Sequence, residues 1–350
     1  MTWVQVGYWH NTSSLWQRAL AATQDNHRAH ASLGRYYLDH DRLDEAERQF
    51  GDAVRIFPRS PDYRYFLGTV ALYLGKSDEA AARFADAISI APRFVGAWQN
   101  RGVSLLRMER PAAAAGCFRK VLELEPGSDD AYGGLGFALW RTGNHEEAVQ
   151  AYEAALKHNP KHAHAWRGLG LVFLARGRYE ESLQFFSKAV QFQPLFAEAY
   201  SEAGLASGRL NAWSKAVTYH LSAVRLENER ERIMLNMNGH PPTEDSTRRS
   251  VICLCRLGLA LSRSGDRGGA FEAYGDAFQR DPDWPDKLAA KARRLATASD
   301  AHLRDPHLAY ELACQAIEGV GTPSSVMLHT LAITQAELDN SRDADQTRLR

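Results

Sequence analysis

The sequence has few cysteines and no net charge, and both shortages narrow the classes of function. Four cysteines among 350 residues are too few and too scattered for a disulfide framework. Lysine plus arginine equals aspartate plus glutamate at 42 each, so the whole-chain field attracts neither nucleic acid nor an anionic membrane. No apolar run approaches the roughly 18 residues that a membrane span needs. We therefore expect no nucleic-acid partner, no membrane insertion and a cytoplasmic location.

Catalytic signatures are also lacking. The chain has no metalloprotease helix motif, Walker-type phosphate loop or nucleophile elbow. Gly133–Gly136 and Arg167–Gly170 resemble fragments of a dinucleotide-binding loop, but neither follows a strand pattern. The pattern therefore predicts a protein that is not an enzyme and has no cofactor.

A cysteine pair and a group of three histidines could in principle bind a metal, but both have simpler interpretations. Cys253 and Cys255 lie two apart on a predicted helix, so they point to different sides. His158, His162 and His164 surround a predicted turn, where solvated histidines are the expected state. The sequence favours packed thiols and turn histidines over a metal site.

The sequence does contain an internal repeat of 34 residues. One glycine series is Gly34, Gly68, Gly102, Gly136, Gly170 and Gly204. An alanine series is Ala46, Ala80, Ala114, Ala148 and Ala216, broken by Ser182. An aromatic series is Phe50, Phe84, Phe118, Tyr152 and Phe186, ending in His220. A proline series is Pro58, Pro92, Pro126, Pro160 and Pro194.

The spacing inside one unit, Ala163–Phe196, predicts two antiparallel helices. Apolar and small residues three to four apart form one face of each helix. Gly177 falls where the first helix must end, in the left-handed conformation that glycine accepts. Pro194 ends the second helix because it lacks a backbone donor. One such pair cannot bury its apolar face alone, so successive pairs must stack.

The alternation of an A/H/Y-x-x-x-LG helix with an EA-x-x-x-(F/Y)-x-x-A-x-x-x-x-P helix resembles the tetratricopeptide repeat (TPR) family. The resemblance covers His27 to about Arg230 as six units and Val251–Trp284 as a seventh. It implies an all-α fold, a right-handed α-solenoid (superhelix) of antiparallel helix pairs. It also implies a non-catalytic scaffold for protein–protein interaction.

The breaks in the pattern predict the domain organisation. We expect a capping helix at 1–26, six units over 27–230, an insertion at 231–250, a seventh unit at 251–284, degenerate helical repeats at 285–340 and a frayed polar tail at 341–350. Within the insertion, ENERERIMLNM can prolong the preceding helix, whereas NGHPPTEDSTRR has the composition of an exposed loop. Residues 295–313 resemble the divergent closing segment of many bacterial TPR proteins.

The amino-terminal segment has two interpretations. GYW followed by a lone second helix, over about Gln5 to Leu33, resembles the join before the repeats of O-mannosyltransferase-like membrane glycosyltransferases. That resemblance implies an accessory repeat region that recruits acceptor protein, in the soluble part of a membrane-attached protein. The alternative is a plain capping helix. An apolar end at Trp3 and Trp16 is also open to end-to-end self-association.

The TPR resemblance implies a peptide-binding groove lined by the first helices. Projected onto this chain, the groove residues are Arg35, Tyr65, Phe66, Tyr73, Asn100, Arg107, Phe137, Trp140, Arg141, Arg167, Arg209, Arg256 and Arg263. Acids at the innermost positions are few, namely Asp39 and Glu202.

Arginine and large aromatics are enriched at binding hot spots, and arginine pairs with carboxylate or phosphate. The groove is therefore predicted to hold a protein or an extended, acidic peptide. The alternative is that the arginines only solvate the concave face. Asn100 has no matching basic and asparagine neighbours in adjacent units, so the pattern lacks both the carboxylate clamp and the asparagine ladder known in the family.

Overall fold

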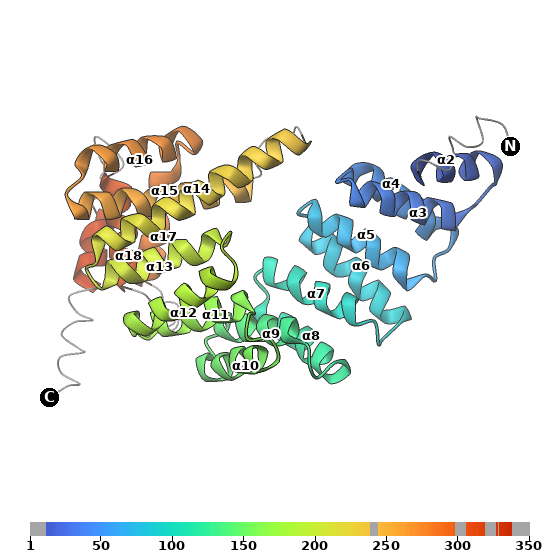
Figure 1. Ribbon diagram of the computed structural model, residues 1–350, viewed down its shortest axis with the longest axis horizontal. Coiled ribbons are helices and arrows are strands. Elements are labelled where there is room, and N and C mark those ends of the chain that lie inside the picture. The colour runs from blue at the N-terminus through green and yellow to red at the C-terminus, as the bar shows by residue number, and fades with distance from the viewer. Residues whose placement is uncertain (1–11, 239–243, 298–305, 319–326, 328, 338–350) are drawn as a thin grey trace. The chain divides into compact units, whose positions relative to one another are not determined.

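The computed structural model describes residues 12–238, 244–297, 306–318, 327 and 329–337. Every regular element in these ranges is an α-helix, as predicted (Figure 1). The chain divides into two compact units, Met1–Gly168 and Leu169–Arg350. No helix among the described residues is long and apolar enough to cross a membrane.

The helices follow one another in pairs. Unit 1 contains α2 (Thr12–Ala22), α3 (His27–Asp39), α4 (Leu43–Ile56), α5 (Pro61–Tyr73), α6 (Ser77–Ile90), α7 (Val95–Arg107), α8 (Pro111–Leu124), α9 (Asp129–Arg141) and α10 (His145–His158). The unit boundary falls inside α11 (Ala163–Ala175). Unit 2 contains α12 (Tyr179–Phe192), α13 (Ala197–Arg209), α14 (Trp213–Asn238), α15 (Glu244–Ser264), α16 (Arg267–Arg280), α17 (Trp284–Thr297) and α18 (Pro306–Glu318).

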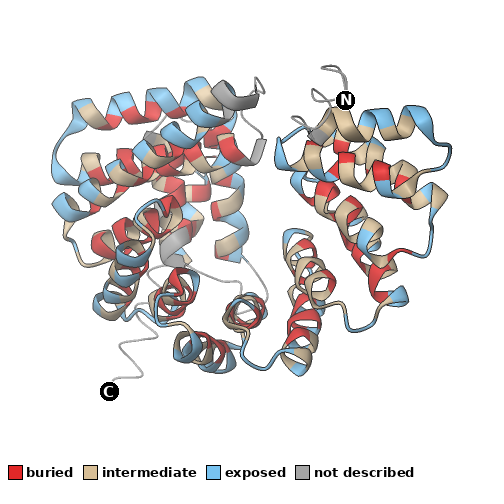
Figure 2. Cartoon of the chain, turned by 45° about the vertical axis from the view of Figure 1, so that its right-hand side comes forward, coloured by how far each residue is buried: buried red, intermediate tan, exposed pale blue. Residues whose placement is uncertain are grey.

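The odd-numbered helices from α3 onward are the first helices of the repeats, and the even-numbered ones are the second helices. Each first helix packs on its own second helix, for example α5 on α6 and α15 on α16. First helices of successive repeats also contact one another, as α3 and α5, α5 and α7, and α13 and α15 do. Buried residues lie on the helix sides that face these neighbours (Figure 2). Within each unit the first helices therefore form one layer.

The first helices α3 to α15 are each followed within two residues by a residue in the left-handed conformation, as predicted for Gly177 (φ 72°). These residues are Asp41, Gly75, Glu109, Gly143, Gly177 and Asn211, which are 34 residues apart, and Gly265 after the insertion. A sharp turn there brings the second helix back against the first, and the chain keeps that turn even where the residue is not glycine.

A contact between a glycine and an aromatic ring holds each helix pair together. A Cβ atom added at Gly102 would lie 2.8 Å from the ring of Phe118 in the partner helix, closer than real Cβ contacts allow. The same contact joins other pairs, each separated by 16 residues in sequence. The pairs are Gly34 with Phe50, Gly68 with Phe84, Gly136 with Tyr152, Gly170 with Phe186, Gly204 with His220, and Gly258 with Tyr274.

Small polar residues at this junction make a further bond in one repeat. Ser182 is fully buried, and its Oγ donates to the carbonyl oxygen of Gly170 at 2.8 Å. Ser182 occupies the position that alanine holds in most other repeats, and this bond gives its buried hydroxyl a partner. The two small residues therefore let the helices of this repeat approach closely.

The insertion in unit 2 is more helical than its sequence predicts. Helix α14 runs on to Asn238, and α15 begins at Glu244, so residues 244–249, predicted as loop, are helical. Glu231 on the extended α14 joins the two helices, because Ser250 Oγ donates to its carboxylate at 2.5 Å. Arg280 of α16 donates to the same carboxylate at 2.7 Å. These bonds give the helical start of α15 a partner that the local composition does not reveal.

The last repeats pack through small residues. Ala292 of α17 is buried against Leu312 and Ala313 of α18. Residues 329–337 are α-helical, and Thr334 among them is fully buried. The predicted frayed tail, the GYW motif and Trp3 lie outside the described residues. The predictions about self-association and about a glycosyltransferase appendage therefore stay predictions.

The glycine–aromatic contact predicts opposite effects of alanine at two helical glycines. Gly102→Ala should lower the free energy of unfolding by about 1–3 kcal/mol, because the new methyl overpacks against Phe118. Gly116→Ala in the same helix pair has open space at its Cβ and should raise it by roughly 0.5–1 kcal/mol. Urea denaturation followed by circular dichroism measures both. Equal effects of the two substitutions would contradict the role of the contact.

Candidate functional site: the first helices and a basic pocket

The predicted groove residues of the first repeats in unit 1 form one contiguous cluster. The rings of Tyr65 and Phe66 are 5.5 Å apart, and Phe66 stacks on the core ring of Phe50 at 5.2 Å. The guanidinium of Arg35 lies 5.9 Å from the centre of the Phe66 ring. Asn100 donates to the Tyr65 hydroxyl at 3.3 Å. Helices α3, α5 and α7 thus place an arginine, two aromatics and an amide side by side.

A second group lies on α7 and α9. The partly buried rings of Phe137 and Trp140 are 5.6 Å apart, and the exposed Arg141 follows them in sequence. Arg141 Nη2 lies 3.7 Å from a Glu109 carboxylate oxygen. Arg107 donates one N–H to the carbonyl oxygen of Leu72 at 2.9 Å, which fixes its stem across to the preceding first helix.

The other predicted groove residues are more dispersed. Tyr73, at the end of α5, is 64% exposed. Arg167 and Arg209 are both partly buried, on α11 and α13. Arg263 lies exposed in the last turn of α15. Arg256 belongs to a separate pocket of unit 2. The structure thus places eight of the thirteen residues in two groups on first helices of unit 1.

The placement of acids on second helices and of arginines on first helices has in part a purely structural cause. Pairs of acids occupy the first turn of second helices, as Asp44 and Glu45 do in α4 and Glu146 and Glu147 do in α10. Arginines occupy the last turn of several first helices, namely Arg107, Arg141, Arg209 and Arg263. Both positions complement the helix dipole. These arginines therefore need no ligand to explain their presence.

A cavity of about 580 Å³ opens between first helices of unit 2. It is lined by Leu205 of α13, by several residues of α15 and α17, and by Leu312 and Gln315 of α18. Its charged lining consists of Arg248, Arg256, Arg280, Asp281, Lys287, Lys291 and Arg294. Six of these seven side chains are cationic. Of this pocket the sequence predicted only Arg256.

Three of the pocket's cations are held by neighbouring polar groups. Arg256 Nη1 donates to Ser201 Oγ at 2.7 Å. Lys287 bonds Asp281 at 2.8 Å, and Arg280 bonds Glu231 as described above. Arg248, Lys291 and Arg294 have no carboxylate partner among the side chains that the structure describes. Burial lowers the pKa of Lys291, and repulsion from Arg256, Arg248 and Arg294 lowers it further.

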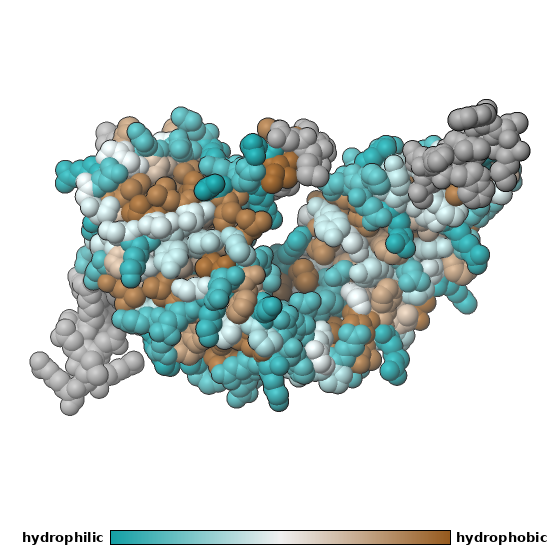
Figure 3. Space-filling model, viewed as in Figure 1, coloured by the Kyte–Doolittle hydropathy of each residue, from teal (hydrophilic) through white to brown (hydrophobic). Residues whose placement is uncertain are grey.

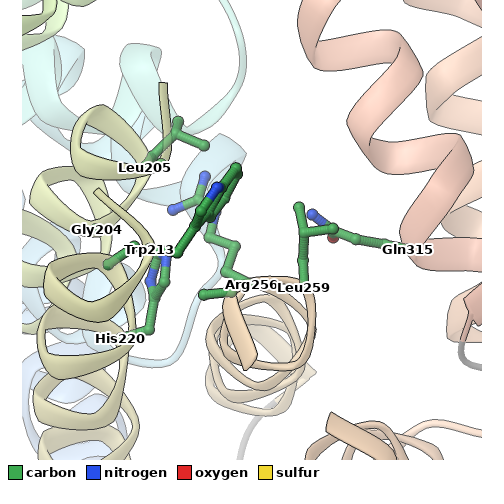
Figure 4. A pocket seen from close by; sticks show the side chains of 10 residues that line it. Gly204, Leu205, Trp213, His220, Arg256, Leu259 and Gln315 are labelled. Carbon is green, nitrogen blue, oxygen red and sulfur yellow. The ribbon is translucent and has the colours of Figure 1, made fainter. Parts of the chain in front are cut away.

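A smaller cavity of about 20 Å³ lies beside this pocket and shares Leu205, Arg256 and Gln315 with it (Figure 4). His220 of α14 points into the space between α13 and α15 and takes the aromatic position of the repeat. Its Nδ1 is buried without a hydrogen-bond partner among the described residues. Burial and the charge of Arg256 lower its pKa to about 3.

The prediction of solvated turn histidines is wrong for His162, whereas the prediction of packed thiols at Cys253 and Cys255 is confirmed. His162 is buried, and its Nδ1 accepts from the backbone N–H of Ala165 at 3.0 Å. Its Nε2 then donates to Asp130 at 3.1 Å. Burial raises the pKa of the Cys253 thiol to about 11, so it is a poor nucleophile. Among the described residues no group of histidine, cysteine and carboxylate side chains could hold a metal ion.

The hydropathy of the face shown in Figure 3 does not single out one binding patch. On the face shown in Figure 3, apolar areas interrupt hydrophilic surface in both units. The most exposed large apolar side chains are Leu195 and Phe271, at 78% and 79%. They lie on different segments, a turn and α16, so neither joins the clusters above.

The family comparison decides the identification. A family model described as tetratricopeptide repeat matches residues 13–63, 65–129, 100–156 and 134–195, which together cover more than half of the chain. The chain belongs to the tetratricopeptide repeat family. No curated protein was found to match this TPR sequence.

Solved TPR structures resemble this chain at low identity. A tetratricopeptide repeat protein from Parabacteroides merdae is 16% identical, with a TM-score of 0.56 over 89% of this chain and 100% of its own. YrrB, described as a TPR protein with an unusual peptide-binding site, is 20% identical, with a TM-score of 0.46 over 53% of this chain and 96% of its own. PilF of Pseudomonas aeruginosa is 18% identical, with a TM-score of 0.48 over 63% and 92%. Such similarity concerns the fold alone.

The sequence missed most of the basic pocket for two reasons. Arg248 falls in the stretch predicted as a loop, and Lys291 and Arg294 fall where the 34-residue period has ended. The signal that was available is the run LAAKARRLAT at residues 288–297, in which Lys291, Arg293 and Arg294 occur without any acid. The groove positions themselves stay a projection from the family.

Substitution of His220 should change the pH dependence of stability in this TPR chain. The unfolded imidazole binds a proton below about pH 6.5, but the folded one does so only at about pH 3. Its contribution is therefore complete above pH 6.5 and is lost as the pH falls toward 3, by up to about 1.4 kcal/mol per pH unit. His220→Phe removes this loss and restores the repeat's aromatic.

Thermal unfolding at pH 7.0 and 4.5 measures the effect. We expect His220→Phe to be more stable than the parent by about 1 kcal/mol at pH 7, because no unpaired nitrogen is buried. The difference should widen at pH 4.5. A difference that is the same at both pH values would contradict a neutral, buried His220.

Proposed function

We propose that this TPR chain is a non-catalytic scaffold that binds an extended, acidic segment of a partner protein along its first helices. The observation that carries the proposal is the placement of partly exposed aromatic rings beside arginines on successive first helices. Arg35 lies over Phe66, and Arg141 follows the Phe137–Trp140 pair. Such neighbours combine an apolar anchor with a bidentate donor, the two side-chain types enriched at binding hot spots.

The aromatic rings and the arginines contribute different interactions to binding. The rings of Phe137 and Trp140 offer apolar surface for a ligand side chain, and they lose little conformational entropy because their own packing already orders them. Arg107 keeps further N–H groups after its bond to the Leu72 carbonyl. Those N–H groups and the Arg141 guanidinium are available to carboxylates.

Acidic character in the ligand follows from charge. Several second helices begin with a pair of acids, whereas the predicted groove positions of the first helices are mostly arginine and aromatic, with Glu109 as the acid that the structure places beside Arg141. A peptide without carboxylates would desolvate the arginines without pairing them, at a cost in affinity. Acidic residues interspersed with apolar ones match both parts of the layer.

A charge reversal tests the proposal. The probe is a fluorescent peptide of alternating glutamate and leucine, measured by polarisation with the full chain. Replacing Arg107, Arg141 and Arg167 together by Glu should weaken binding by a factor of about 100 or more, since each lost charged hydrogen bond costs roughly 1.5–3 kcal/mol. The same triple change at Arg48, Arg55 and Arg119 of second helices is the matched control.

Circular dichroism of each variant verifies that the fold is kept. Binding that survives in the first-helix variant, or that is lost equally in the control, would contradict the proposed surface. A matched peptide of alternating lysine and leucine should not bind the parent chain.

A further inference from the structure

The pocket of unit 2 carries more positive charge than its surroundings neutralise. After Lys287 is paired with Asp281 and Arg280 with Glu231, four cations remain around one cavity. They are Arg248, Arg256, Lys291 and Arg294. Arg256 has only the neutral Ser201 hydroxyl as its partner. No carboxylate among the described side chains bonds the other three.

Helix dipoles do not account for this charge. Arg248 lies in the second turn of α15, near the end where a helix disfavours a cation. Lys291 lies in the middle of α17, half-buried and facing three like charges. Only Arg294 occupies a favourable last turn. Lys291 sits partly buried among like charges, and the convergence of these cations on one cavity points to a bound anion.

The remaining lining is mostly apolar, with Thr247 and Gln315 as its polar members. Val251 and Ile252 of α15 face the cavity, as do Leu288 of α17 and Leu312 of α18. A cavity of about 580 Å³ is large enough for a side chain with its anionic group and the residues that flank it. The pocket therefore suits an anion attached to an apolar body.

We propose that this pocket binds a phosphoryl group carried on a side chain of the partner peptide. The proposal rests on the proposed function, because it names the modification that unit 2 recognises in that ligand. A carboxylate offers one negative charge and two oxygens. A phosphoryl group offers about 1.5–2 charges and three strong acceptor oxygens, which several cations converging on one cavity can share.

The geometry assigns a role to each cation. The guanidinium of Arg256 is oriented by Ser201 and lies at the junction with the smaller cavity (Figure 4). Arg248 and Arg294 approach from α15 and α17, and their planar groups can each bond two phosphoryl oxygens. Lys291 gains a counter-ion, which offsets the repulsion that it has from Arg256, Arg248 and Arg294.

Three peptides that differ at one position test the proposal. Each has leucine and alanine on both sides of a central phosphoserine, glutamate or serine, and each is titrated calorimetrically into the full chain. We expect the phosphoserine peptide to bind at least tenfold more tightly than the glutamate peptide, and the serine peptide not to bind. Equal affinity for phosphoserine and glutamate would overturn the proposal.

Phenyl phosphate and benzoate test whether the pocket recognises a phosphoryl group on a peptide or on any small ester. Both present one anion on the same apolar ring, without a peptide backbone. Phenyl phosphate should bind measurably and compete with the phosphoserine peptide, but far more weakly than that peptide. If phenyl phosphate binds as tightly as the peptide, the pocket is a site for small phosphate esters, and the peptide proposal is wrong.

Substitution of Lys291 separates a binding role from a structural one. Lys291→Gln should weaken the phosphoserine peptide about tenfold or more and also raise the midpoint of thermal unfolding by roughly 2–4 °C, because it removes a repelled, half-buried cation. Arg293→Gln, at the exposed neighbouring position that does not line the pocket, should change neither quantity. A less stable Lys291→Gln variant with unchanged affinity would contradict the proposal.

The two proposals fail in different ways. Binding of the glutamate–leucine peptide depends on Arg107, Arg141 and Arg167 in the acidic-scaffold proposal. Phosphoserine selectivity depends on Lys291 and Arg294. Loss of selectivity with retained glutamate–leucine binding would reject the phosphoryl pocket alone. Selective binding of phosphoserine without any glutamate–leucine binding would reject the unit 1 surface alone.

Discussion

The fold depends on one contact, the ring of an aromatic residue seated on a glycine of the partner helix. Because the glycine has no Cβ, the two helices of a repeat approach until the ring of Phe118 would meet a methyl at 2.8 Å. The left-handed turn that closes each first helix keeps the pair at this distance. The first helices consequently lie side by side in a layer, and their unpacked faces carry the surface that we propose for ligand binding.

The one repeat in which this aromatic residue is replaced also differs in the residues around the contact. In the sixth repeat His220 replaces the aromatic, and a nitrogen without a partner is buried beside a small cavity. That cavity adjoins the basic pocket through Arg256, whose charge helps keep the imidazole neutral. The long α14 and early α15 follow directly, joined through Glu231. The departures from the repeat are thus concentrated in unit 2, next to the densest cluster of cations.

Sequence periodicity predicts the regular part of this fold because each repeat makes the same local contacts. The glycines, their aromatic partners and the turn at Gly177 could all be placed from the 34-residue period. The start of α15 could not, because its helix is stabilised by Glu231 in another helix and not by its own residues. The pocket was missed for a similar reason: Arg248 and Lys291 meet only after three helices pack. The projected groove positions gave two clusters in unit 1, and their role in binding is a proposal.

Arginine-specific chemical footprinting tests the central claim that the first helices carry the binding surface. The full chain is modified with phenylglyoxal, with and without the glutamate–leucine peptide, and each arginine is followed by mass spectrometry. The account predicts protection of Arg35 and Arg141 on first helices and no change at Arg48 and Arg119 on second helices. Protection of Arg48 and Arg119 without protection of Arg35 and Arg141 would contradict it.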